Sequence, residues 1–263
     1  MGLLSLYWNL LTNYFICISY SGQNYSGFQA QSHENTVQDK LFTVLRKIFG
    51  NLLQHSFSGR TDAGVHAEEQ FISFTVCRYV NENKLHYALS RMLPCDIGVK
   101  SVRVTKEYID ARKSAISREY KYLFSTGDLP QYLCSRITLR KSLKEISYYN
   151  KLAKEFIGKH DFVNFRKKGS SEKSTIRTIK FFRFNKFDVK DIYSNNTFQV
   201  YEAHIIANSF LYRMVRNIMG VIFEIVEKDI QEIDLKSIVN AKSGMVRYIP
   251  APANGLTLYK VNY

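Results

Sequence analysis

Residues 14–20 read YFICISY, a short run of β-branched and aromatic residues that predicts a buried strand. A loop rich in Gly, Ser and Asn follows over 21–35, and the apolar residues of 36–49 then recur at helical spacing. Asn35 or Thr36 is placed to cap that helix, because short polar side chains accept hydrogen bonds from the first turn. The stretch therefore predicts a strand, a loop and a helix in succession.

The same alternation continues along the chain and repeats in its second half. Strand patterns occur at 70–77, 98–107, 118–124, 197–207 and 256–261, and near 176–187. Helix patterns occur at 82–92, 143–157 (with Gly158 as its C-cap) and 209–227, and near 234–241. Strands and helices in two comparable halves predict an α/β or α+β protein with a ligand site in a cleft between the halves. We expect an extension at 1–12, an N-terminal half at 13–112 and a C-terminal half at 113–263.

The composition narrows the class of partner. Among 263 residues, 37 are Lys or Arg and 23 are Asp or Glu, which gives a formal net charge of +14. The 18 Phe and 18 Tyr argue against a disordered chain. Because no run of about 20 apolar residues occurs, a membrane bundle is excluded. A strongly positive chain favours a polyanionic partner, although charge alone does not separate RNA, DNA and anionic lipid.

The cysteines and the N-terminus favour a cytosolic protein. Four cysteines, at 17, 77, 95 and 134, are widely spaced with no C-x-x-C pair, which argues against a thiolate zinc site. We expect them to be reduced and mostly buried. The first dozen residues are apolar but short and lack a basic start, so an extension is favoured over a cleaved signal peptide.

The first candidate site is the loop SGRTDAGVHA at 58–67. It carries Arg60 and Asp62 between two glycines, and it lies between a predicted helix and a predicted strand, where functional groups are commonly presented. A tight turn in which Asp62 accepts local backbone hydrogen bonds explains the same residues about equally well. Spacing alone leaves both readings open.

Two further segments combine cations with aromatic rings or an apolar helix. On the strand at 118–124, Arg118 and Tyr120 share one face, which suits a stacked base with phosphates nearby; a buried tyrosine pair is the alternative. Arg213 and Arg216 are three apart on the predicted helix 209–227, where they suit a carboxylate or a phosphate; a solvated flank is the alternative.

A basic loop around Lys167 and Lys168 also suits phosphate binding, and a solvated surface explains it about equally well. The histidines show no metal-ligand spacing, and no dinucleotide or triphosphate fingerprint occurs.

Together and in this order, the segments resemble the pseudouridine synthases of the TruA type. The resemblance rests on SGRTDAGVHA and on YSGFQAQ (25–31), LPCDIGVKSV (93–102), DARKSAISREYKY (110–122), FRKKGSSEKSTIRTI (165–179), NSFLYRMVRNIMG (208–220) and APANGLTL (251–258). It covers nearly the whole chain from Tyr14. Phe28 stands where the family often has Trp, and a frequent cysteine is absent near Ser170 and Ser171.

The resemblance implies a function and a set of site residues. It implies isomerisation of uridine in the tRNA anticodon stem-loop, at tRNA positions 38, 39 and 40. Asp62 matches the family's catalytic aspartate, Arg60 the arginine implicated in displacing the target nucleotide, Tyr120 the tyrosine that stacks on the uracil, and Arg216 the arginine that pairs with the carboxylate. Arg118, Arg213, Lys167 and Lys168 are our candidates for RNA contacts. The resemblance also implies two α/β halves in a mixed, largely antiparallel sheet, with helices on one side and a basic cleft on the other.

It further implies a homodimer and no cofactor, and we expect neither a DNA nor a membrane partner. The reaction neither oxidises nor hydrolyses, and one ionised carboxylate serves it either as a nucleophile at C1′ or as a base at C2′. A catalytically inactive RNA-binding protein or tRNA chaperone is the alternative function.

Overall fold

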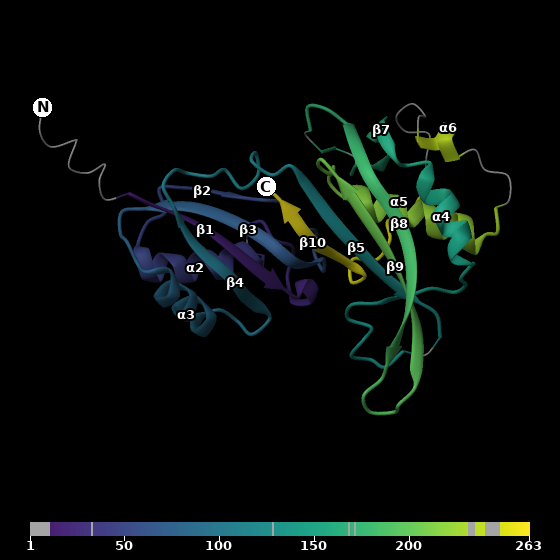
Figure 1. Cartoon of the computed structure of the whole chain (residues 1–263), viewed down its shortest axis with the longest axis horizontal. Coiled ribbons are helices and arrows are strands. Elements are labelled where there is room, and N and C mark those ends of the chain that lie inside the picture. The colour runs from purple at the N-terminus through teal and green to yellow at the C-terminus, as the bar shows by residue number, and fades with distance from the viewer. Residues whose placement is uncertain are drawn as a thin grey trace, which may run out of the picture. The chain divides into compact units, whose positions relative to one another are not determined.

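The chain folds into two compact units (Figure 1). The computed structural model describes residues 11–32, 34–127, 129–167, 169–170, 172–230, 235–239 and 248–263. One unit comprises Met1–Ile116 and Leu258–Tyr263, and the other comprises Ser117–Thr257. The last strand therefore returns to the unit in which the chain begins.

The first unit is an antiparallel sheet with two helices. Its strands and helices are β1 (Thr12–Tyr20), η2 (Gly22–Asn24), α2 (Val37–Phe49), β2 (Gln54–Phe57), β3 (His66–Val76), α3 (Glu82–Met92) and β4 (Ile97–Thr105). The strand order is β4-β1-β3, with β2 paired to β3 and with β10 (Leu256–Asn262) following β3. The pairs β1–β3, β1–β4 and β2–β3 are all antiparallel.

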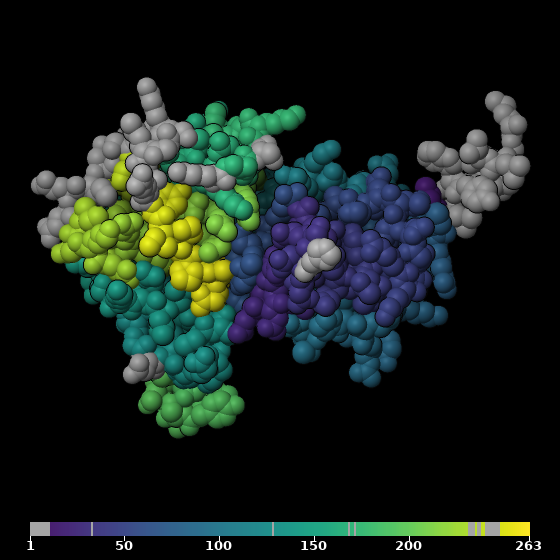
Figure 2. All heavy atoms as spheres, turned by 180° about the vertical axis from the view of Figure 1, so that it is seen from behind, coloured from purple at the N-terminus to yellow at the C-terminus, as the bar shows by residue number. Residues whose placement is uncertain are grey.

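Both helices of this unit cover one face of its sheet. Tyr14, Ile16 and Ile18 alternate along β1 and are at most 1% exposed, and the Tyr14 ring lies 5.3 Å from that of Phe49 in α2. On the same side, His86 of α3 bonds to the Val99 carbonyl. Figure 2 shows this side, with the dark-blue atoms of α2 over the sheet. The predicted helix at 36–49 is confirmed, and the Thr36 side chain caps it by accepting from the Asp39 N–H.

The second unit is also built on antiparallel strands. Its elements are β5 (Ser117–Ser125), β6 (Thr138–Leu139), α4 (Ile146–Lys154), β7 (Gly158–Asp161), η3 (Val163–Phe165), β8 (Ile176–Lys190), β9 (Thr197–Ala207), α5 (Met214–Glu227) and α6 (Leu235–Val239). The strand order is β5-β9-β8-β7, and β6 pairs with β5 in parallel. The end of the β8–β9 hairpin projects from the rest of this unit (Figures 1 and 2).

An aromatic core joins the helices of the second unit to its sheet. Phe124 of β5 is fully buried, and its ring centroid lies 5.5 Å from that of Tyr149 in α4 and 5.0 Å from that of Phe223 in α5. Both helices therefore pack on the face of β5 that carries Phe124. The predicted α/β class with a mixed, largely antiparallel sheet is confirmed.

Two predicted helices begin or end at the wrong residue. The prediction for 143–157 runs too far at both ends, because the bonds of Glu155, Phe156 and Ile157 tighten to the third residue back and end α4. Gly158 is therefore not its C-cap, and it opens β7 instead. The helix predicted at 209–227 begins only at Met214, because Arg213 adopts a left-handed conformation with φ of 66°. The strand predicted at 70–77 begins earlier, at His66, and β2, β6 and β7 were not predicted.

The prediction of mostly buried cysteines is wrong. Cys17 lies in the core on β1, Cys134 is half-buried, and Cys77 and Cys95 are exposed. Both exposed thiols follow the end of a core element, β3 and α3 respectively, where the chain has left the core. Within the described part of the chain, no helix combines the length and hydropathy needed to cross a bilayer.

Candidate active site

The loop that carries Arg60 and Asp62 connects β2 to β3 within the first unit. The strands pair up to Phe57 and Ile72, and the Ser58 N–H then donates to the Phe71 carbonyl at 2.9 Å. Arg60 is exposed and Asp62 is half-buried. The loop thus presents a cation and a carboxylate at the end of a paired hairpin.

A buried glutamine on β3 holds the beginning of this loop. Gln70 is 0% exposed, and its Nε2 donates to the Gly59 carbonyl at 2.6 Å. Its Oε1 accepts from the Ser58 hydroxyl at 3.0 Å, and that hydroxyl also accepts from the Phe71 N–H at 3.1 Å. These bonds fix the backbone directly before Arg60, because each buried group is satisfied in only this arrangement.

The segment after β1 holds the middle of the loop. The Tyr20 hydroxyl bonds to the Thr61 hydroxyl at 2.8 Å, and the Phe28 N–H donates to the Thr61 carbonyl at 3.2 Å. Gly27 has φ of +102°, and a Cβ there would lie 2.8 Å from the Thr61 carbonyl oxygen. Only glycine allows the two backbones to approach so closely. The residue directly before Asp62 is therefore clamped.

A third set of contacts holds the end of the loop. The Gly64 N–H donates to the Tyr25 carbonyl at 3.2 Å, and the Gly22 N–H donates to Nδ1 of His66 at 3.2 Å. His66 is fully buried, so its imidazole serves the packing of the loop with Nδ1 as an acceptor. A Cβ on Gly22 would lie 2.0 Å from the Val65 carbonyl oxygen, which again requires glycine.

In the second unit, Tyr120 and Arg118 lie on one face of β5, as the alternation of that strand predicts. Tyr120 is 8% exposed, and its ring meets that of Phe210 edge-on at 5.0 Å. The Arg118 guanidinium donates to the Asn208 carbonyl at 3.2 Å. Both residues therefore contact the segment that leads into α5.

Two of the predicted cations flank Tyr212 in the same unit. The Lys167 ammonium lies 5.0 Å from the centroid of the Tyr212 ring, and the Arg213 guanidinium carbon lies 5.7 Å from it. The Lys167 N–H also donates to the Tyr212 carbonyl at 2.9 Å, and Tyr212 in turn donates its N–H to Glu172 at 3.2 Å. A positive, partly exposed aromatic surface results, which suits RNA phosphates and bases.

Glu172 remains a carboxylate within this basic surface. Burial alone would raise its pKa, but hydrogen bonds from the Ser170 hydroxyl and from backbone N–H groups, with the charge of Arg166, hold the pKa below its ordinary value. Its negative charge offsets one of the neighbouring cations and fixes the Tyr212 backbone.

Arg216 is oriented by the segment before β10 that contains Ala251. Its Nε donates to the Ala251 carbonyl at 2.8 Å, and the Ala251 N–H donates to the Arg216 carbonyl at 2.9 Å. Close approach is possible because Gly220 lies one turn further along α5, where a Cβ would lie 2.2 Å from the Ile249 carbonyl oxygen.

The structure thus brings the predicted residues together in two groups. Arg60 and Asp62 share one clamped loop. In the second unit, Arg118, Tyr120 and Lys167 contact the segment 208–212, which Arg213 follows, and Arg216 lies on α5. Lys168 lies outside the described residues. Among those residues, no three His, Cys, Asp or Glu side chains gather in a way that would hold a metal ion.

Sequence reasoning missed the residues that hold the loop. Gln70 had a readable signal, because it falls on the buried side of β3 in phase with Ile72, Phe74 and Val76. A polar side chain at such a position requires a buried partner. Tyr20 and Gly22 gave no such signal, since their contacts to the loop join residues more than 40 positions apart.

We compared this chain with models of protein families, with the sequences of known proteins and with solved structures. A model of the family described as tRNA pseudouridine synthase matches residues 152–263. The tRNA pseudouridine synthase A of Acetivibrio thermocellus is 32% identical over 254 residues, which cover 96% of this chain and 100% of the relative. That of a Thermoanaerobacter species is 35% identical over 258 residues, covering 96% and 100%. That of Borreliella burgdorferi is 35% identical over 249 residues, covering 94% and 97%.

A chain in the crystal structure of a Cbf5–Nop10–Gar1 complex aligns with 99% of this chain and 51% of its own length, but its TM-score of 0.34 and identity of 10% carry no argument. The matches to the three relatives do carry one, because they cover 94–96% of this chain and 97–100% of each relative, and because the three names agree. This chain belongs to the tRNA pseudouridine synthase family.

Proposed function

We propose that this chain isomerises uridine to pseudouridine in tRNA, and that its targets lie in the anticodon stem-loop. The observation that carries the proposal is the half-buried carboxylate of Asp62 on a loop whose beginning, middle and end are each clamped. Catalytic groups need fixed positions, because small misplacements are costly in rate. The family names of the relatives supply the substrate class.

The reaction rearranges bonds within one nucleotide. The N1–C1′ bond breaks and a C5–C1′ bond forms, while C5 loses a proton and N1 gains one. Asp62 acts either as a nucleophile that forms a sugar ester at C1′ or as a base that removes the C2′ proton. Both routes require the ionised carboxylate, and both end in the same product. Water must be kept from C1′, because it would hydrolyse a reactive sugar intermediate.

The target base must leave the helical stack before it reacts. Flipping a base costs a few kcal/mol. We assign Arg60 to the vacated space, because it is exposed and lies two residues before Asp62 on the same rigid loop. We assign Tyr120 to stack on the flipped uracil, which contributes about 1–3 kcal/mol.

The remaining cations are assigned to the carboxylate and the RNA backbone. Arg216 is assigned to pair with the Asp62 carboxylate, since a guanidinium can donate two parallel hydrogen bonds to a carboxylate. Arg118, Arg213 and Lys167 would contact phosphates, as would Lys168, and binding would then weaken as salt rises.

Three substitutions test the assignment of the catalytic residues. Asp62→Asn should abolish pseudouridine formation, measured by nucleoside chromatography of digested tRNA, while tRNA affinity stays within a few-fold. Detectable turnover by this variant would remove Asp62 from the catalytic role. Arg216→Ala should lower the rate more than Arg213→Ala, and the reverse order would reassign the partner of the carboxylate.

A second candidate function is RNA binding without catalysis. The surface formed by Lys167, Tyr212 and Arg213 favours it, because that surface needs no carboxylate to bind RNA. Tight tRNA binding without product from the wild-type chain would support this function instead.

Two properties of the working protein remain predictions. We propose a cytoplasmic location for a chain that acts on tRNA, which localisation of a tagged chain in cells would test. The homodimer that the resemblance implies would show in solution as twice the chain mass by light scattering.

A further inference from the structure

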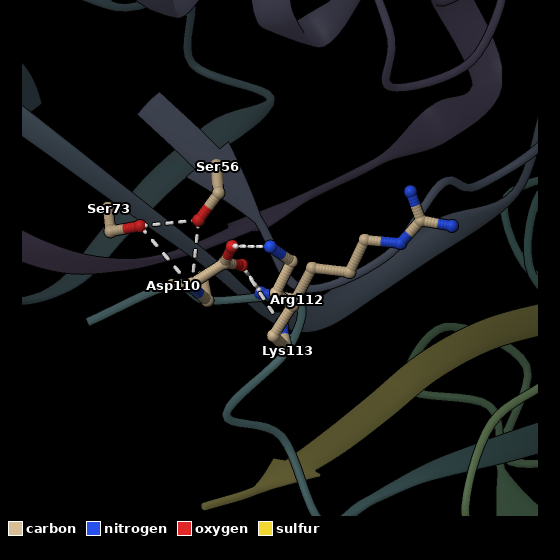
Figure 3. A network of polar contacts seen from close by, with 6 residues as sticks. Ser56, Ser73, Asp110, Arg112 and Lys113 are labelled. Carbon is tan, nitrogen blue, oxygen red and sulfur yellow. Dashed lines mark hydrogen bonds and ion pairs between the residues drawn. The ribbon is translucent and has the colours of Figure 1, made fainter. Parts of the chain in front are cut away.

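A turn in the first unit, Asp110–Ser114, belongs to the motif DARKSA, to which the proposed reaction assigns no role. The Asp110 carboxylate accepts from the N–H groups of Arg112 at 2.9 Å and Lys113 at 3.0 Å (Figure 3). The Ser114 N–H donates to the Asp110 carbonyl at 2.9 Å. The backbone of the turn is therefore held in one conformation by its own first residue.

The centre of the turn is also fastened to the sheet. The Ala111 N–H donates to the Ser56 hydroxyl at 2.8 Å and to the Ser73 hydroxyl at 3.3 Å, and the two hydroxyls bond to each other at 2.7 Å (Figure 3). The Ala111 carbonyl accepts from the Tyr263 hydroxyl at 2.8 Å. Ala111 is fully buried, and both of its backbone groups are satisfied by side chains, those of Ser56 and Ser73 in the sheet and that of Tyr263 after β10.

An aromatic cluster holds the ring of Tyr263 in place. Its centroid lies 5.1 Å from that of Phe15 on β1 and 5.1 Å from that of Phe71 on β3, both edge-on. Tyr263 is nevertheless 40% exposed. The turn thus lies beside an exposed ring on the sheet face opposite α2 and α3.

The turn presents two cations from this fixed backbone. Arg112 and Lys113 are both exposed, and the Arg112 side chain extends away from the Asp110 carboxylate in Figure 3. The Lys113 ammonium lies 3.8 Å from that carboxylate, with its side chain 85% exposed. Asp110 offsets one of the two charges, but its oxygens are largely occupied by backbone donors. A pre-ordered cation pair of this kind binds an anion at a lower entropic cost than two cations on a mobile loop.

The turn is connected to the loop that carries Asp62. Ser56, which anchors Ala111, lies on β2 two residues before Ser58, where the loop begins. Ser73, the other anchor, lies three residues after Gln70 on β3. A phosphate bound at the turn would therefore be held at a fixed distance from the carboxylate through one short hairpin.

We propose that the turn Asp110–Ser114 is an RNA-backbone site, at which Arg112 and Lys113 contact phosphates of the tRNA and set its register over the loop of Asp62. The identity of the RNA rests on the proposed function. The turn positions the substrate and takes no part in the chemistry.

The test is the salt dependence of tRNA binding by a double variant, Arg112→Gln with Lys113→Gln. The backbone bonds of Asp110 are kept in this variant, so the turn should remain folded. Each phosphate contact contributes about 0.9 to the slope of log affinity against log salt. Two lost contacts should therefore lower the slope by about 1.8. Between about 50 and about 200 mM salt, the affinity of the variant for tRNA should then fall about twelvefold less than that of the wild type.

The control is Lys47→Gln with Lys84→Gln, which removes the same charge from exposed positions on α2 and α3, over the opposite face of the sheet. This control should keep the wild-type slope. In steady-state assays the loss in the turn variant should fall on KM rather than kcat. Thermal unfolding of all three proteins checks that they remain folded.

Three outcomes would overturn the proposal. Equal slopes for the turn variant and the control would mean that the turn does not contact phosphates. An unchanged slope with a lower kcat would mean that the turn acts on the catalytic loop alone. An unchanged slope with a changed molecular mass would make this face an interface between copies of the chain. Failure of the proposed function is distinguishable, because it would show as no product from the wild type, whereas this test measures binding.

Discussion

The replacement Gln70→Met removes the carboxamide that holds the loop before Arg60 while nearly keeping the volume of the side chain. It leaves the Gly59 carbonyl without the donor that now lies 2.6 Å away and the Ser58 hydroxyl without its acceptor at 3.0 Å. The Ser58 hydroxyl keeps its bond from the Phe71 N–H at 3.1 Å, so the main cost is the unpaired Gly59 carbonyl, and the free energy of unfolding should fall by about 1–3 kcal/mol.

The same replacement should slow the reaction. The freed backbone of Ser58 and Gly59 would let Asp62 shift, and a displacement of about 1 Å at a catalytic group costs about a hundredfold in rate. We expect single-turnover pseudouridine formation at saturating tRNA to fall at least tenfold, with the affinity for tRNA nearly unchanged. This split between rate and affinity would not follow from a loss of stability alone.

A matched control is available in the second unit. The Asn150 carboxamide, like that of Gln70, makes two hydrogen bonds: it donates to the Phe184 carbonyl at 3.0 Å and accepts from the Phe184 N–H at 2.8 Å. Asn150→Leu should therefore lose comparable stability in urea unfolding and keep its rate. The reasoning is refuted if Gln70→Met loses stability but keeps a rate within twofold of the wild type, or if both variants slow the reaction equally.

Three other predictions follow from local geometry. Tyr120→Phe keeps the ring and should retain more activity than Tyr120→Ala in the same assay; equal losses would argue against stacking. Gly220→Ala places a Cβ 2.2 Å from the Ile249 carbonyl oxygen and should lower the free energy of unfolding by about 1–3 kcal/mol in urea, whereas an unchanged value would contradict the close packing. Burial of Asp110 would raise its pKa, but backbone donors outweigh it and depress the pKa, so its charge stabilises the fold above about pH 4 and loses that effect as pH falls through the lower, folded-state pKa. Asp110→Asn should therefore be less stable than the wild type near neutral pH, and urea unfolding of the two should converge in acid; a constant difference would contradict the assignment.

Helices with clear boundary residues were predictable from the sequence. The helix α2 begins after the Thr36 cap and ends at Gly50, which has φ of +79°, and both residues could be read in advance. The start of α5 could not be predicted in this way. Arg213 adopts a left-handed backbone conformation, and arginine has no preference for that conformation that the sequence would reveal. Near this start the Arg216 side chain bonds to Ala251, which lies 35 positions away in the sequence, so the residue pattern around the start does not reveal the contact.

The candidate site was also predictable only in part. Glycines, a cation and a carboxylate in ten residues marked the loop, because the residues that act lie close together in sequence. The residues that hold the loop come from β1, from the segment after it and from the far side of β3. The role of these residues can be recognised only once the fold brings them to the loop. Gln70 is the exception, because its place in the alternation of β3 indicates a buried polar side chain.

Site-resolved mapping of pseudouridine on an unmodified tRNA transcript tests the central claim most directly. The transcript is incubated with the wild-type chain and with Asp62→Asn, without added metal or nucleotide. We expect pseudouridine in the anticodon arm from the wild type alone, which would assign reaction, substrate region and catalytic residue in one experiment. Product at the same positions from both proteins would contradict the role of Asp62, and tight binding without product from either would replace the proposed enzyme with an RNA-binding protein.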